Sequence, residues 1–156
     1  MESNLLEWLT MFGEWGIVII IGIEGWIALK QHRSSKIFDT VKYVEDPETR
    51  EARKRIYENL RRQKHSLERW WERDEKLRDA AAIVCVRYNL VGAVTKNDRK
   101  VREFVAREWA HNICETYEAL QNYIRYRENP ETGIPGAFHQ YQWLYIEAKT
   151  YRSSKK

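Results

Sequence analysis

The sequence predicts an all-α protein: one N-terminal transmembrane helix followed by a cytoplasmic antiparallel bundle of about four helices. Three observations predict this fold class. Residues 15–29 are apolar except for a single glutamate and the glycines. The rest of the chain is rich in charge, and its apolar residues recur every three or four positions, as in amphipathic helices. The 156 residues include only 3 prolines and 7 glycines, which favours long helices with short connections.

Residues 5–29 are long enough to cross a bilayer as one helix. A transmembrane helix needs about 20 apolar residues, and this range would form roughly 37 Å of helix at about 1.5 Å per residue. Trp8, Trp15 and Trp26 suit the aromatic belts at membrane interfaces. The alternative is a buried helix of a soluble protein, but no other segment supplies enough apolar surface to cover this helix on every side.

The charges that flank this span indicate its orientation. Residues 1–14 contain no lysine or arginine, whereas Lys30 and Arg33 follow the span directly at the membrane interface. The positive-inside rule therefore places the N-terminus outside the bacterial inner membrane and the C-terminal domain in the cytoplasm. Because the start lacks a basic region and a cleavage site, we interpret it as a retained anchor. The predicted domains are the anchor with its basic flank, residues 1–36, and a helical bundle with a frayed C-terminal tail, residues 37–156.

Two glutamates interrupt the apolar segment, Glu14 toward its outer end and Glu24 near its middle. An acidic residue near the bilayer centre costs about 2.5–3.5 kcal/mol, which offsets most of the gain from the surrounding isoleucines. Both glutamates fall in one sector of the helix, apart from the tryptophans, and Gly25 on that side permits close helix approach. We therefore expect a homo-oligomer with Glu24 turned inward, either hydrogen-bonded or lining a narrow polar path for cations. The alternative is a monomer.

Four further helices are expected after the anchor, joined by short loops in an antiparallel bundle. Asp46 is a good N-cap because Pro47 follows it at the first helical position. Gly92 suits a left-handed helix end, and either Asn97 or Asp98 caps the third of these helices. The expected helices cover residues 46–64, 66–92, 99–127 and 137–151.

The second of these helices should be central, because residues 80–86 are apolar on nearly every side. We interpret Trp70 and Trp71 as packing aromatics, with a ligand-stacking pair as the alternative. Cys85 and Cys114 lie in apolar-periodic segments and are expected to be reduced core thiols. No Cys–His spacing resembles a zinc site, so the sequence predicts no metal, and it predicts no cofactor.

A basic stripe is expected on the first helix after the anchor. Its members fall within a sector about 100° wide on a helical wheel, and they are Arg50, Arg53, Lys54, Arg61 and Lys64. Such a stripe near the bilayer can contact anionic lipid headgroups or a nucleic-acid backbone. The plainer interpretation is a solvated face whose charge is relieved by glutamates on the same helix.

Several landmarks together resemble a known bacterial family. They follow an N-terminal span and comprise Asp46-Pro47, the helix end at residues 88–92, Trp109 and Arg125. The chain resembles small membrane-anchored helical proteins classed as a domain of unknown function, over most of residues 44–150. The resemblance implies a membrane-anchored helical fold. It implies no activity, so no functional residue is carried over.

A looser likeness connects the chain to membrane-anchored accessory proteins of CRISPR systems, which join a span to a helical domain of the HEPN type. HEPN nucleases look like helical bundles with an arginine and a histidine separated by four to six residues. No histidine of this chain has an arginine at that spacing. Arg107 and His111 come closest, one helical turn apart, and are the weak catalytic candidates.

The sequence therefore predicts a non-enzymatic, single-pass inner-membrane protein whose helical domain binds an unidentified protein partner. Its other expected partners are the lipid bilayer and further copies of the chain, with nucleic acid less favoured. A role in phage defence rests on the looser likeness alone. The alternatives are a degenerate HEPN-like RNA-processing domain at the membrane and a soluble helical regulator. Phosphate-binding loops and nucleophile elbows are absent from the sequence.

Overall fold

The computed structural model describes the backbone of residues 2–62, 69–131 and 133–155, and the side chains of residues 23–59, 69–131 and 133–155. All regular secondary structure within these ranges is helical, which confirms the all-α prediction. Internal contacts divide the chain into two compact units, Met1–Ser35 and Lys36–Lys156.

Helix α1 spans Glu2–Glu45 and so includes residues of both units. The side chains of Trp8, Glu14 and Trp15 lie outside the described residues. Within the described part of the chain, no helix combines the length and the apolar character needed to cross a membrane.

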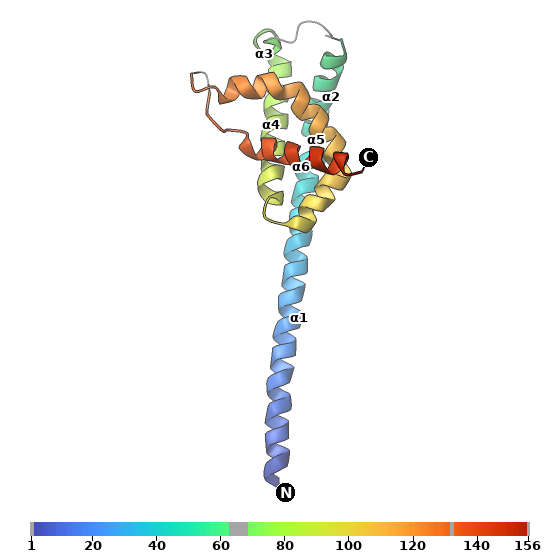
Figure 1. The fold of residues 1–156 in the computed structure, drawn as a ribbon, viewed down its shortest axis with the longest axis vertical. Helices are drawn as coiled ribbons and strands as arrows, with labels where there is room; N and C mark the ends of the chain where they lie inside the picture. Colours follow the sequence, from blue (N-terminus) through green and yellow to red (C-terminus); the bar gives the residue numbers. More distant parts are fainter. Residues whose placement is uncertain (1, 63–68, 132, 156) are drawn as a thin grey trace. The chain divides into compact units, whose positions relative to one another are not determined.

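The second unit is built around one central helix. Its elements after α1 are α2 (Pro47–Arg62), α3 (Trp70–Arg73), α4 (Glu75–Thr95), α5 (Arg99–Glu128) and α6 (His139–Ser153). Helix α4 packs against each of the other four, and its Val84 and Cys85 are completely buried, as the apolar run predicted. Figure 1 shows α6 crossing α4 and α5 instead of lying alongside them, so the packing is not antiparallel throughout.

The expected single helix over residues 66–92 is interrupted and ends later than expected. Its expected start at Ser66 lies outside the described residues. The helix is broken at Asp74, whose carboxylate accepts a hydrogen bond from the Leu77 amide at 3.0 Å and caps α4. The helix then continues past Gly92 to Thr95. Gly92 is not a left-handed cap: a Cβ there would collide with the carbonyl oxygen of Gln140, so this glycine allows α6 to cross α4 closely.

Aspartate and asparagine side chains fix three other helix starts. Asp46 accepts from the Thr49 amide at 3.4 Å, and Asp98 accepts from two amides of the first turn of α5, which confirms both predicted caps. Helix α6 begins at His139, later than expected. Its first turn is capped from outside, because the Asn89 side chain on α4 accepts hydrogen bonds from the amides of Gln140 and Tyr141 at 3.1 Å each.

Aromatic packing and buried thiols account for other predicted residues. Trp70 and Trp71 are buried, and the Trp70 ring stacks on Tyr123 at 5.8 Å between centroids, which confirms the packing interpretation. Cys85 and Cys114 are buried free thiols, as expected. Burial raises the pKa of Cys85, so this thiol stays protonated and unreactive.

Candidate functional site

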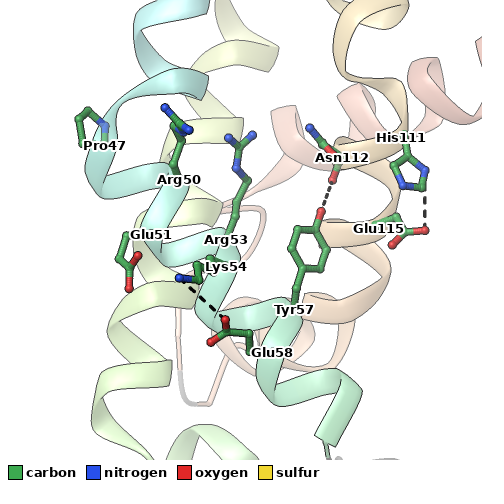
Figure 2. Close-up of a pocket in the computed structure, with 10 residues that line it drawn as sticks. All are labelled: Pro47, Arg50, Glu51, Arg53, Lys54, Tyr57, Glu58, His111, Asn112 and Glu115. Atoms are coloured by element: carbon green, nitrogen blue, oxygen red, sulfur yellow. Dashed lines mark hydrogen bonds and ion pairs between the residues drawn. The ribbon is translucent and has the colours of Figure 1, made fainter.

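A groove of about 710 Å³ lies between α2 and α5. Figure 2 shows side chains from both helices around it. The lining residues are Pro47, Arg50, Glu51, Arg53, Lys54, Tyr57, Glu58, His111, Asn112 and Glu115. The groove therefore brings together His111 and the three members of the basic stripe whose side chains are described, although they lie far apart along the chain.

Not every predicted residue reaches this groove. Arg50 and Lys54 line it and are exposed, as a surface stripe requires. Arg107 does not line it. The side chains of Arg61 and Lys64 lie outside the described residues.

Arg53 is buried, which corrects its expected place in a basic stripe that faces solvent or a ligand. Its residue exposure is only 8%, and its guanidinium donates a hydrogen bond to the Tyr88 hydroxyl of α4 at 3.1 Å. Burial disfavours the charged guanidinium, but Tyr88 and Glu45 outweigh that effect and raise the pKa of Arg53. Arg53 is one turn from Ile56 on the buried side of α2, so its stem follows the apolar face inward.

The Glu45 carboxylate contacts three side chains near the Pro47 end of the groove. Glu45 lies 3.9 Å from Arg50 and 3.8 Å from Arg53, and it accepts a hydrogen bond from the Trp109 indole at 3.0 Å. Further along α2, Lys54 lies 4.0 Å from Glu58. Arg50, Arg53 and Lys54 therefore each have an acidic neighbour.

The groove carries equal numbers of opposite charges. Its lining includes three cations (Arg50, Arg53, Lys54) and three carboxylates (Glu51, Glu58, Glu115). Such a balance does not favour a polyanion over other ligands, because nucleic-acid surfaces need an excess of unpaired lysine and arginine. A groove with charges of both signs suits a partner protein whose surface also carries charges of both signs.

Tyr57 is a half-buried donor that sequence analysis missed. Its hydroxyl donates to the main-chain carbonyl of Asn112 at a long 3.5 Å. Burial, and then the neighbouring Tyr88, raise the pKa of Tyr57 to about 12, against an opposing effect of Arg53. The phenol is therefore a hydrogen-bond donor at neutral pH and not a base. Only the spacing of Tyr57 one turn after Arg53 and Lys54 hinted at its position.

The two weak catalytic candidates each have a separate acidic partner. Arg107 is exposed and pairs with Glu108 at 2.7 Å. His111 is exposed and lies 3.8 Å from Glu115, one turn further along α5. This arrangement resembles surface charge pairing along a helix, in which neither side chain is oriented toward a shared reacting atom.

The described residues at the end of the predicted span are all exposed. Ile23, Glu24, Trp26, Ile27 and Leu29 are each open on α1, and a Cβ added at Gly25 would meet nothing within 4 Å. Lys30 lies over the Trp26 ring at 5.3 Å from its centroid, and Arg33 is half-buried.

No group of three or more histidine, cysteine or carboxylate side chains suited to a metal occurs among the residues that the structure describes. Comparisons with protein-family models, with curated proteins and with solved structures find no match to this chain. The site is therefore interpreted from its own chemistry.

Proposed function

We propose that the protein is a non-enzymatic membrane-anchored interaction module. Residues 5–29 hold it in the bacterial inner membrane with the N-terminus outside, and the second unit binds a partner protein in the cytoplasm. The proposal includes self-association of the span through Glu24, and a role in phage defence that rests only on the looser family likeness.

The observation that carries the proposal is the exposed apolar surface of α1. Trp26 and Leu29 are each 63% exposed, and Ile23 and Ile27 lie beside them on the same helix. Each square ångström of apolar surface left in water costs about 25 cal/mol, so contiguous exposure of this kind marks a contact surface. The sequence continues the apolar run toward the N-terminus as far as Trp15, and lysine and arginine follow its other end. Lipid is the environment that fits this order of residues.

The groove is the proposed partner-binding face. It combines charges of both signs with a half-buried tyrosine donor, Tyr57. Tyrosine and arginine are the side chains that most often contribute large parts of a binding energy, and charge complementarity sets the orientation of a partner. Arg50 and Lys54 are the exposed cations of the groove, which makes them suitable positions for charge reversal.

One membrane preparation tests both parts of the proposal. One portion, washed with alkaline carbonate, should retain the full-length protein, and release into the wash would contradict the anchor.

A second portion is dissolved in detergent, and proteins bound to the tagged chain are identified. The double substitution Arg50→Glu with Lys54→Glu should lower the amount of a specific partner recovered with the chain at least tenfold. The control Arg55→Glu lies on α2 outside the groove and should retain it. If the unsubstituted chain, the double variant and the control all recover the same amount of every partner, the groove is not the binding face.

A further inference from the structure

Helix α4 has apolar residues on two faces, and only one of them is covered. The inner face lies in the core of the second unit. The outer stripe, as we call it, consists of Ile83, Val86, Leu90 and Ala93. Val86 is 50% exposed, Leu90 is 39% exposed and Ala93 is exposed, whereas Ile83 is partly buried against the core. Isolated exposed apolar residues are ordinary, but a continuous stripe on one helix face marks an interaction surface.

The spacing of the outer stripe is that of a helix–helix seam. Its four residues follow one another at intervals of three, four and three positions. These are the a and d positions of a heptad, which pack against the same positions of a second helix. Ala82 precedes the stripe and Ala93 ends it, so the side chains near both ends are small and a second helix can approach closely.

We propose that the outer stripe binds the outer stripe of a second copy of this chain, with the two α4 helices antiparallel. The charges at the two ends of the outer stripe indicate that a second copy of the chain binds there. Asp79 lies one turn before the stripe and Lys96 follows it, and both are exposed, so each can meet a charge on another chain. Antiparallel pairing places Asp79 of one copy beside Lys96 of the other.

The same pairing places Val86 of each copy against Leu90 of the other, around one two-fold axis. A parallel pair would instead set Asp79 against Asp79, which is unfavourable. A lipid surface fits the stripe less well, because lipid-binding faces are rich in free cations along their rim, whereas this stripe has Lys96 at one end and Asp79 at the other. The adjacent Arg87 is held by Asp46 at 3.9 Å and by Glu48 at 3.6 Å.

Disulfide trapping tests this interface in the full-length chain. Two differently sized tagged copies are co-expressed, one with Val86→Cys and one with Leu90→Cys, and whole cells are broken in the presence of a copper–phenanthroline oxidant. Since a disulfide needs Cβ atoms about 4 Å apart, the mixed dimer should exceed either homodimer several-fold. Cys85 and Cys114 are buried, so the unsubstituted chain should give no dimer. A predominant Val86→Cys homodimer, or no dimer at all, would overturn the antiparallel interface.

Charge exchange provides the second measurement. Asp79→Lys alone and Lys96→Asp alone should each lower the mixed-dimer yield several-fold, and both substitutions together in each copy should restore it. Ile146→Asp is the control, because Ile146 is 54% exposed on α6 outside the stripe, and it should leave the yield unchanged. Failure of the double exchange to restore the yield would refute the charge pairing. The assay uses unfractionated cells, so its result is independent of whether the chain is membrane-anchored.

Discussion

Arg53 shows how one residue of a regular charge pattern acquires a different role from its neighbours. The helical wheel places it in the same sector as Arg50 and Lys54, yet its guanidinium reaches the Tyr88 hydroxyl inside the unit. The hydroxyl of Tyr141 continues this buried polar region by donating to Thr116 at 2.9 Å. Such interior hydrogen bonds contribute little net energy when complete, but an unpaired buried group is costly.

Arg53→Met should therefore destabilise the second unit. The methionine retains much of the apolar stem but leaves the Tyr88 hydroxyl without its donor, at a cost of about 1–3 kcal/mol. Arg55→Met is the matched control, since Arg55 only pairs with Glu51 on the surface of the same helix at 3.2 Å, a contact worth about 0.5 kcal/mol. Thermal unfolding of the full-length proteins measures both. Equal melting temperatures for the two variants would refute the structural role of Arg53.

Glu24 is the residue on which the proposed self-association of the span depends. With Gly25→Cys as a reporter on the same side of the helix, oxidised membranes should yield a disulfide-linked dimer. Adding Glu24→Leu should reduce this dimer several-fold, because the polar contact between copies is removed while insertion becomes more favourable. Ile27→Leu serves as the control. A dimer band that survives Glu24→Leu unchanged would show that Glu24 does not hold the copies together.

At the scale of elements, α4 is the helix whose place in the packing is most evident from its sequence. Its apolar run correctly predicted a central helix, because a helix that is apolar on nearly every side must be covered on most of them. Its ends were predicted less well. Asp74 divides the charged segment before it, and Gly92 has two possible roles, helix end or close crossing. Only the position of α6 decides between these roles, and α6 is distant in the sequence.

Gly92→Ala should be destabilising although alanine is the better helix former by about 1 kcal/mol. The added methyl group would clash with the main-chain carbonyl of Gln140. Because this atom belongs to the backbone, no side-chain rotation can relieve the clash, and a strained core typically costs about 1–3 kcal/mol. Gln121→Ala is the helical control, because Gln121 is exposed on α5 and alanine there meets no packed element. Circular dichroism melts distinguish the two. A melting temperature raised by Gly92→Ala would contradict the close crossing of α4 and α6.

At the scale of the whole molecule, the sequence predicted the fold class and most helix ranges but not the candidate site. Caps such as Asp46 and Asp98 act within a few residues, so local chemistry is enough to place them. The groove instead depends on α2 lying beside α5, which brings Tyr57 next to Asn112. No local pattern encodes that pairing. The outer stripe of α4 was likewise hidden, because its apolar residues are indistinguishable in sequence from those of the core.

The central claim is a membrane anchor with the second unit in the cytoplasm, and paired reporter fusions at the C-terminus test it most directly. Lys30 and Arg33 follow the apolar segment, so the positive-inside rule predicts a fluorescent protein fusion that is bright and an alkaline phosphatase fusion that is inactive. A chain with Glu2→Lys, Glu7→Lys, Lys30→Glu and Arg33→Glu should shift toward the opposite pattern. Strong phosphatase activity with a dark fluorescent fusion in the unsubstituted chain would contradict the account.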